Sequence, residues 1–488
     1  MTVVLGGGIS GLSAAYYAIN ETRLASVALL EASDRVGGWI RSRNSPSGAL
    51  FEQGPRLVRP QGPAGLNTLN MIEDLQLTNK LISIGRSHPM ARNRLIYSQQ
   101  ALHVLPTSLK GLFKTISLLD RPLINILWTD LRASKVSKED ESIYSFVQRR
   151  FGQDIADHII SPIVCGVYAG DARQISVNFM FKSLFEMEQK HGSVVKGLLI
   201  NQLEKLFSRT KSRETKEDAD ESVEDSSATS LARKARLENW AIWSLQGGLE
   251  QLPLALVNNL EKRGVRIETG TKCERLTFKA DRVELSVNGN ARECSRVISS
   301  LPAKKLAELL QEQYPELSAE LRAIPSVTVA VANLEYRGDV LPLEAFGFLI
   351  PPQENLPLLG VIFDSCMVPK KSNTSTVLTV MMGGAWFEKH FGPSPTEEQL
   401  LKTAIDGVRD ILCITEEPVA HHIAVLKDCI PQHVVGHAQR KKRIHDYISA
   451  HRIPLAVCGS SYQGVGVNDV ILSAKQAVRD VVKSRITR

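Results

Sequence analysis

The chain has 488 residues, 43% of them hydrophobic and 23% charged, with a formal net charge of +7. These values are ordinary for a globular protein long enough for two or three domains, and they exclude fibrous and disordered classes. The mild positive charge has no basic block that would indicate nucleic acid as a partner. It suits acidic small molecules, an anionic membrane surface or a plain solvated surface equally.

The first residues carry the most informative pattern. An apolar run at 2–5 leads into Gly6, Gly8 and Gly11, spaced G-x-G-x-x-G, and this predicts a strand, a tight turn and a helix N-terminus. Gly6 permits the turn, Gly8 lets the backbone approach a pyrophosphate, and Gly11 lets the helix pack closely. A second apolar run ends at Glu31, where an acidic side chain accepts ribose hydroxyls. The alternative is a glycine-rich turn in an ordinary βαβ unit.

The segment after Glu31 indicates which dinucleotide the chain binds. Residues 31–41, with Gly37 and Gly38, and residues 51–55 resemble the extended FAD fingerprint of the amine oxidase superfamily. Two further glycines leave backbone without Cβ atoms free to lie against the flavin side of the pyrophosphate. A surface turn is the alternative.

Other residue types predict no competing chemistry. The seven cysteines are scattered and lack a C-x-x-C pair, which indicates reduced thiols and no disulfide framework. His421, His422, His433 and His437 have no recognised metal-ligand spacing, so we expect core or surface histidines and no metal. We also expect no cleavable signal, because the glycine motif begins almost at Met1, and no spanning helix, because no apolar run approaches about 18 residues.

The predicted fold class is α/β plus α+β. A discontinuous Rossmann-like FAD-binding domain comprises residues 1–88, 237–302 and 451–488. Residues 89–207 form a mainly helical, membrane-associating and substrate part. Residues 303–450 form a substrate-binding domain with a mixed sheet. Residues 208–236 are polar and of low complexity, and we expect a disordered insertion.

Local patterns support this division. Apolar spacing over 66–77 predicts a helix after the loop at 54–56, and a closing strand of the FAD domain is predicted at 297–302. Strands of the substrate domain are predicted at 327–332, 361–363 and 377–382.

Two segments at 105–114 and 118–128 mix apolar residues with lysine, arginine and tryptophan. Such amphipathic segments can lie in a bilayer interface, or they can pack on the core of a helical subdomain, and the sequence favours neither.

Six motifs then resemble one family. They are the first glycine motif, residues 37–41, residues 54–56, residues 165–171, residues 243–249 and residues 462–469. Over essentially the whole chain, this set resembles the animal members of the protoporphyrinogen oxidase family, within the FAD-dependent amine oxidase superfamily. Only residues 208–236 look like an insertion.

The resemblance implies oxidation of protoporphyrinogen IX to protoporphyrin IX in haem synthesis, by one non-covalent FAD per chain. Six electrons leave in three steps, and molecular oxygen reoxidises the flavin with release of three hydrogen peroxides. It also implies a monotopic protein on the intermembrane-space side of the mitochondrial inner membrane, a homodimer, and hand-over of product to the iron-inserting enzyme.

The resemblance further implies site residues. A porphyrinogen is a broad apolar ring with two propionates, which suits an aliphatic and aromatic cavity with one or two arginines. The implied substrate residues are Arg94, Arg56, Ala169, Phe346, Leu349 and Met381. The implied cofactor residues are Gly6, Gly7, Gly8, Ile9, Ser10, Gly11, Glu31, Trp39, Arg41, Gly54, Pro55, Arg56, Leu57, Cys273, Ser460, Val465, Gly466 and Val467.

Several alternatives stay open at this level. Either arginine could form a structural ion pair, and Phe346, Leu349 and Met381 could be ordinary core. An amine oxidase or a carotenoid-type desaturase would share the fingerprint, and a flavin-binding partner protein without catalysis belongs to another class. No side chain is identified as a general base, so positioning of the substrate is expected to carry the rate.

Overall fold

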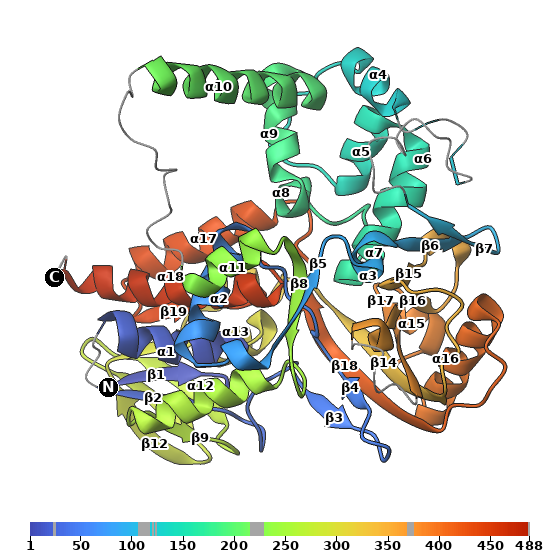
Figure 1. The fold of residues 1–488 in the computed structure, drawn as a ribbon. Coiled ribbons are helices and arrows are strands. Elements are labelled where there is room, and N and C mark those ends of the chain that lie inside the picture. The colour runs from blue at the N-terminus through green and yellow to red at the C-terminus, as the bar shows by residue number, and fades with distance from the viewer. Residues whose placement is uncertain are drawn as a thin grey trace.

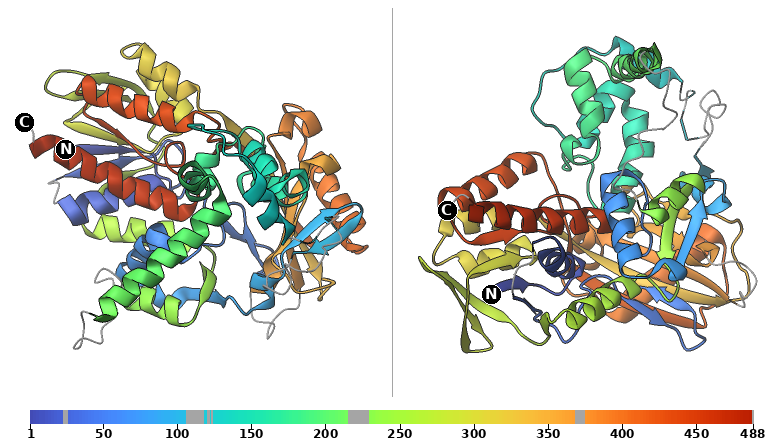
Figure 2. Two further views of the ribbon diagram at one scale, coloured as in Figure 1. Left: turned by 90° about the horizontal axis from the view of Figure 1, so that it is seen from above. Right: turned by 60° about the vertical axis from the view of Figure 1, so that its left-hand side comes forward.

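The computed structural model describes residues 1–22, 26–105, 118–119, 122, 124–214, 229–367 and 375–486. Figure 1 shows a parallel sheet with its helices at the lower left, a mixed sheet at the lower right, and a helical unit above both. The right-hand view of Figure 2 again shows the helical unit standing on one side of the two sheets. The first element, β1, is a strand of the parallel sheet, and the last element, α18, packs on this sheet.

The parallel sheet is built from distant parts of the chain. Its strand order is β19-β13-β1-β2-β9, and all four neighbouring pairs are parallel. The strands are β1 (Thr2–Leu5), β2 (Val27–Leu30), β9 (Arg266–Glu268), β13 (Arg296–Ser299) and β19 (Leu455–Val457). The carboxyl ends of strands from the beginning, middle and end of the chain therefore meet at one edge.

Both faces of this sheet are buried, which explains its short and continuously apolar strands. Val4 and Leu29 contribute to a core with helices α1, α12 and α18, whereas Val3 and Leu30 contribute to a core on the other face. The first face carries α1 (Ile9–Thr22), α2 (Gly62–Asp74), α11 (Ser230–Leu237), α12 (Gln251–Lys262) and α18 (Val467–Ile486). The second carries β10 (Cys273–Phe278), β11 (Val283–Val287), β12 (Asn290–Cys294), α13 (Ala303–Leu310), α14 (Pro315–Arg322) and α17 (His437–Ala450).

The mixed sheet has the order β18-β14-β17-β16-β15-β6-β7, and among its pairs only β15 and β6 run parallel. Its strands are β6 (Leu95–Ser98), β7 (Ala101–Val104), β14 (Ser326–Arg337), β15 (Gly347–Leu349), β16 (Leu358–Phe363), β17 (Ser375–Gly384) and β18 (Ala420–Pro431). One face packs on α15 (Phe387–Phe391) and α16 (Glu397–Leu412), and the other packs on α7 (Ser161–Tyr168).

Small elements connect the parts. These are the hairpin of β3 (Ser42–Asn44) and β4 (Leu50–Glu52), the antiparallel pair β5 (Leu81–Gly85) and β8 (Trp240–Leu245), α3 (Pro89–Arg92), and the short helices η1 (Thr78–Lys80), η4 (Pro352–Glu354) and η5 (Asp364–Met367).

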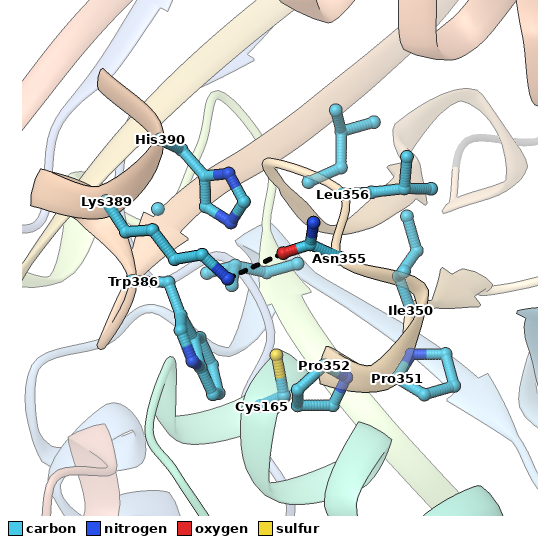
Figure 3. Close-up of a pocket in the computed structure, with 12 residues that line it drawn as sticks. Cys165, Ile350, Pro351, Pro352, Asn355, Leu356, Trp386, Lys389 and His390 are labelled. Atoms are coloured by element: carbon cyan, nitrogen blue, oxygen red, sulfur yellow. Dashed lines mark hydrogen bonds between the residues drawn. The ribbon is translucent and has the colours of Figure 1, made fainter.

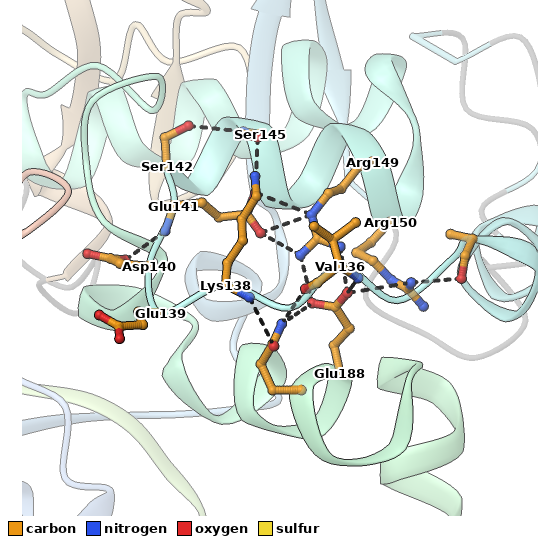
Figure 4. A network of polar contacts seen from close by, with 12 residues as sticks. Val136, Lys138, Glu139, Asp140, Glu141, Ser142, Ser145, Arg149, Arg150 and Glu188 are labelled. Carbon is orange, nitrogen blue, oxygen red and sulfur yellow. Dashed lines mark hydrogen bonds and ion pairs between the residues drawn. The ribbon is translucent and has the colours of Figure 1, made fainter.

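Buried ion pairs, as well as apolar packing, hold the helices of the helical unit together. It comprises α4 (Asn125–Arg132), α5 (Ile143–Phe151), α6 (Gln153–Ile155), η3 (Ala156–Ile160), α7, α8 (Val177–Met180), α9 (Lys182–His191) and α10 (Val194–Glu214). Arg149 of α5 donates to both carboxylate oxygens of Glu188 on α9, at 2.5 and 2.6 Å, and also to Glu141 (Figure 4). The fully buried Arg150 pairs with Asp130 of α4 at 2.5 Å. These pairs fix the three helices to one another.

Several predictions are confirmed, and others need correction. The helix after residues 54–56 is α2, the closing strand is β13, and the strands predicted at 327–332, 361–363 and 377–382 are β14, β16 and β17. In place of disorder throughout 208–236, helix α10 continues to Glu214 and α11 begins at Ser230; residues 215–228 lie outside the described residues. The sequence missed α11 because its polar composition hides a narrow buried face made of Leu231, Ala232 and Ala235.

Two further differences concern the predicted boundaries. β6 and β7, inside the mainly helical stretch 89–207, belong to the mixed sheet. α13, α14 and α17, inside the stretch 303–450, pack on the parallel-sheet side instead of on the mixed sheet. The amphipathic segment at 105–114 lies almost wholly outside the described residues, as does part of 118–128. Across the described ranges, no helix combines the length and apolar composition needed to cross a membrane.

Candidate active site

Two helices begin side by side at the carboxyl edge of the parallel sheet. α1 follows β1 and α18 follows β19, and the two helices pack on each other. Near their starts, Ser10 Oγ donates to Cys458 Sγ at 3.4 Å. The first N–H groups of a helix have no acceptor within it, so this edge presents unsatisfied donors and two positive dipole ends. Such a place binds a phosphate or pyrophosphate group.

The glycines at the first turn are required by geometry. Gly6 has a φ of +99°, and a Cβ on Gly11 would lie 1.9 Å from the Gly6 carbonyl oxygen. A Cβ on Gly8, by contrast, would meet only Gly38 Cα at 3.8 Å. The packing of the fold therefore does not require a glycine at position 8, whereas in dinucleotide-binding folds a glycine at this position leaves room for the pyrophosphate.

A second glycine pair, Gly37 and Gly38, lies against this turn, and we call the two glycine segments together the dinucleotide cradle. Gly37 donates its N–H to the Gly7 carbonyl at 2.8 Å, and Gly8 forms a parallel bridge with Gly37. Arg35 donates to the carbonyls of Gly38 and Ile40, both at 2.8 Å. The loop that contains Gly37 and Gly38 is thus held against the start of α1.

Glu31 lies next to this cradle, at the end of β2. Its Oε2 accepts the Gly7 N–H at 2.6 Å, and its Oε1 accepts the N–H and hydroxyl of Ser33 at 2.8 and 2.7 Å. The carboxylate is therefore fixed beside the glycine turn at the end of β2, the position of the ribose partner in a dinucleotide-binding fold. Ser33 was not identified from the sequence.

The other predicted cofactor residues extend from this edge. Gly54 lies against Trp39, because a Cβ there would come within 1.9 Å of the Trp39 carbonyl oxygen. Burial and the neighbouring cations Arg43 and Arg35 lower the pKa of Arg41. Val465, Gly466 and Val467 form the turn that starts α18, and Leu57 packs towards the α16 side of the mixed sheet. Cys273 begins β10, where burial raises its pKa to about 11.

Arg56 is placed differently from a free anion-binding residue. Its side chain is 5% exposed and pairs with Asp364 of η5 at 2.8 Å, while the Arg56 carbonyl accepts the Ser244 hydroxyl at 2.7 Å. The sequence offered a structural ion pair as one reading of this arginine, and the structure contains that pair. Its charge is already compensated within the protein.

An apolar wall on the mixed sheet faces α7. Leu349 and Met381 both pair with Gly360, on β15 and β17 respectively, so their side chains project from the same face of the mixed sheet. Gly166 of α7 meets this wall directly, because a Cβ on it would lie 2.2 Å from Leu349 Cδ2. The sequence did not identify Gly166, although a glycine inside a helix is itself a sign of close approach.

The other predicted substrate residues are distributed around this wall. Phe346 packs against the core on the α16 face and donates its N–H to the Asn93 carbonyl at 3.4 Å, next to Arg94. Ala169 ends α7 with a φ of 51° and is 1% exposed, and it packs against Gly384. Ala169 therefore packs in the apolar core that also contains Met381.

Arg94 has no ion-pair partner among the described residues, and its side chain is exposed. The protein around it and the cation Arg59 lower its pKa. An unpaired guanidinium next to an apolar wall is suited to bind the carboxylate of an otherwise apolar ligand.

A small pocket opens behind the wall, between α7, the loop after β15 and α15 (Figure 3). It is lined by Cys165, Leu359 and Trp386, which belong to the same apolar core as Met381. Lys389 Nζ donates to Asn355 Oδ1 at 2.6 Å across its rim. Burial raises the pKa of the Cys165 thiol to about 12, which favours the protonated thiol.

Comparison with known proteins covers nearly the whole chain. The family model for flavin containing amine oxidoreductases matches residues 9–482. Protoporphyrinogen oxidase of Homo sapiens is 38% identical over 485 residues, covering 98% of each chain. The protein of the same name from Schizosaccharomyces pombe is 32% identical over 501 residues, covering 98% of this chain and 97% of its own. Coproporphyrinogen III oxidase of Bacillus subtilis is 27% identical over 501 residues, with the same coverage.

Solved structures share the fold. A protein from Exiguobacterium, titled as a candidate protoporphyrinogen oxidase, superposes with a TM-score of 0.79 at 22% identity, over 98% of both chains. Cyclohexylamine oxidase from Brevibacterium oxydans superposes with a TM-score of 0.64 at 13% identity, over 100% of this chain and 99% of its own.

Proposed function

This chain belongs to the family of flavin containing amine oxidoreductases, and on that premise we propose that it binds FAD and uses it to convert protoporphyrinogen IX into protoporphyrin IX. The chain is an oxidoreductase whose reaction is the flavin-dependent oxidation of protoporphyrinogen. One juxtaposition carries the proposal: α7, which faces the apolar wall, ends at Tyr168, and Tyr168 interacts electrostatically with Asp469 in the first turn of α18 and with Arg59, which also acts on Arg94. The start of α18, the wall and the unpaired arginine therefore belong to one region of the molecule.

FAD is favoured among flavins because the residues that would hold it are spread along the sheet edge from β2 to β19, with β1 and β13 between these two strands. Gly8 and the first N–H groups of α1 would hold the pyrophosphate, Glu31 with Ser33 would hold the adenosine ribose, and the turn before α18 would hold the other end. Only a dinucleotide reaches both ends. When bound, the flavin supplies a hydride acceptor for the substrate carbon.

The residues of the chain orient the substrate. Leu349 and Met381 provide a dry surface for the macrocycle, and Arg94 binds a propionate. Arg56 and Asp364 hold the loop that contains Gly54 in place. Each step removes a hydride from a bridging carbon and a proton that passes to water, so alignment carries the rate. Over three steps the hydrides leave from three bridging carbons, and the protons leave from two pyrrole nitrogens and from the fourth bridging carbon. Three such steps remove six electrons, and oxygen takes two each time to give hydrogen peroxide.

The location we propose is the mitochondrial inner membrane, on its intermembrane-space side, with the protein bound to one leaflet as a homodimer that passes its product to the iron-inserting enzyme. Exposed apolar side chains on the outer helices support membrane contact. Leu127 is 41% and Trp128 61% exposed on α4, and Leu199 is 56% exposed on α10. Both helices lie on the upper rim of the molecule (Figure 1), and lysines flank them, as at a bilayer surface.

The test is to supply purified protein with protoporphyrinogen IX in air and record porphyrin fluorescence, oxygen uptake and the visible spectrum of the protein. We expect flavin absorption, fluorescence growth above spontaneous oxidation, and oxygen consumption. Coproporphyrinogen III, which has four propionates, serves as the competing substrate. R94L should keep the flavin spectrum and raise the KM. A yellow protein that leaves protoporphyrinogen at the background rate would reject the substrate, and a colourless one would reject the cofactor.

A further inference from the structure

Residues 432–437 connect the helical unit to the parallel sheet. Ile175 and Val434 form an antiparallel bridge, Ser176 donates its N–H to the His433 carbonyl at 2.9 Å, and Gln432 Nε2 donates to the Tyr168 carbonyl at 3.1 Å. The segment therefore contacts the end of α7 and the start of α8 before it enters α17.

His433 reaches from this segment to the turn after β19. Its side chain is buried, with 2% of the residue exposed, and its Nε2 lies 2.9 Å from the Ser460 carbonyl oxygen. A carbonyl oxygen only accepts, so Nε2 carries the hydrogen. The Phe179 ring of α8 meets the imidazole edge-on at 4.4 Å, and the His437 ring stacks on it at 4.0 Å with an interplanar angle of 8°.

The turn that His433 contacts is held on its other side by the parallel-sheet core. Gly459 has a φ of +107° and donates its N–H to Ser473 Oγ at 3.2 Å, and Ser461 Oγ accepts the Ala303 N–H at 3.2 Å. On the side of this turn that faces the helical unit, the Ser460 carbonyl accepts a hydrogen bond from His433 Nε2.

We propose that His433 is a positioning residue for the cofactor: its Nε2–H orients the Ser460 carbonyl, and the ring sandwich of Phe179, His433 and His437 keeps that donor in place. The inference rests on the proposed function, since it takes the turn at Ser460 as part of the flavin site. The contact from His433 makes flavin affinity depend on how the helical unit packs against the parallel sheet. Burial keeps both imidazoles neutral, which leaves His433 one N–H to donate.

The experiment compares the dissociation constant of FAD for the apoprotein across variants, measured by quenching of flavin fluorescence. H433F keeps a ring between Phe179 and His437 but loses the donor, and we expect about tenfold weaker binding, because a buried carbonyl is left without its partner. H433Q places an amide N–H near the former Nε2, and we expect binding within about threefold of the unmodified protein.

Two further variants separate hydrogen bonding from packing. H433N carries the same amide as H433Q on a shorter side chain, so we expect it to bind as weakly as H433F, and it replaces H433F if that variant does not fold. H437F keeps an aromatic ring stacked on His433, so it should lose less FAD affinity than H433F. Equal affinities for H433F and the unmodified protein, or equal losses in H433Q and H433N, would overturn the proposal. If the unmodified protein does not bind FAD, the proposed function itself fails, which is a separate outcome.

Discussion

In the buried junction between the parallel sheet and the mixed sheet, the guanidinium of Arg56 lies 2.8 Å from Oδ1 of Asp364, with side-chain exposures of 5% and 8%. Thr379 donates its hydroxyl to the other carboxylate oxygen at 2.6 Å, and Asn333 Nδ2 donates to Thr379 Oγ1 at 2.8 Å. Asn333 also donates to the Glu52 carbonyl at 3.0 Å. The network joins the loop around Gly54 to strands β14 and β17.

D364N should strongly destabilise the protein, because it leaves the buried Arg56 charge without a counterion. We expect a loss of about 3–5 kcal/mol in the free energy of unfolding, measured by urea denaturation. The double variant R56M/D364L removes both charges and should lose less than D364N. The exposed pair Lys442–Asp446 provides the control, and D446N should change stability by less than about 1 kcal/mol. Equal effects of D364N and D446N would contradict this account.

G8A should separate cofactor binding from folding. A Cβ at Gly8 makes only an ordinary contact at 3.8 Å, so the chain should fold with unchanged thermal stability. The methyl group would nonetheless stand where the pyrophosphate approaches α1, and FAD affinity should fall at least about tenfold, which is about 1.4 kcal/mol. The control is G85A, where the nearest atom would be at 3.7 Å and no cofactor contact is expected. Unchanged FAD affinity in G8A would place the pyrophosphate elsewhere.

G166A should disturb the apolar wall without affecting the cofactor. Its Cβ would lie 2.2 Å from Leu349 Cδ2, so Leu349 must move. We expect the KM for protoporphyrinogen to rise several-fold, a stability loss of about 1–3 kcal/mol, and unchanged FAD affinity. The second substitution in G166A/L349A makes room for the methyl group and should restore part of the stability. A double variant that is no better than the sum of the single ones would show that the two residues do not interact.

E188Q should loosen the helical unit. Glu188 is fully buried and accepts two hydrogen bonds from Arg149 (Figure 4). Burial works to raise the pKa of Glu141, but its hydrogen bonds from Arg149 outweigh this effect and lower that pKa. Removing one of the two carboxylates that share Arg149 should cost about 3–5 kcal/mol, visible as faster hydrogen exchange in α5 and α9. E186Q, on the exposed face of α9, is the matched control and should exchange like the unmodified protein.

The stacked histidines should make the protein sensitive to acid. Burial lowers the pKa of His433 to about 4 and that of His437 to about 3, and the cation Lys441 acts in the same direction on both. Arg440 adds to the effect on His437. In the unfolded chain these groups titrate near 6.5, so the unfolded state binds more protons below that pH.

Stability should therefore fall as pH decreases from about 6.5 towards 4, by at most about 1.4 kcal/mol per pH unit for each histidine. Urea denaturation at several pH values measures this slope. H433Q removes one of the two groups and should show a shallower fall. Parallel slopes for the two proteins would mean that His433 does not contribute.

Features that depend on local backbone geometry could be predicted from the sequence. The turn at Gly6, the approach at Gly8, the helix contact at Gly11 and the acid at the end of β2 all lie within one short βαβ stretch, where spacing alone fixes what each residue does. The strands β13, β14, β16 and β17 could be predicted for the same reason, because burial of one or both faces of a strand requires apolar residues at alternate or consecutive positions.

Relationships between distant residues were decided only by the tertiary structure. Asp364 lies 308 positions from Arg56, so the sequence left open whether that arginine binds a ligand or a carboxylate of the protein. The contacts of Gly166 with Leu349 and of His433 with Ser460 likewise exist only because α7 and residues 432–437 pack between sheets built from separated segments. The sequence by itself determined the glycine turn between β1 and α1 and the acid beside it, because a backbone motif carries its own geometry. The pairing of charges and the shape of the substrate wall depend on which surfaces meet, and no local pattern encodes that.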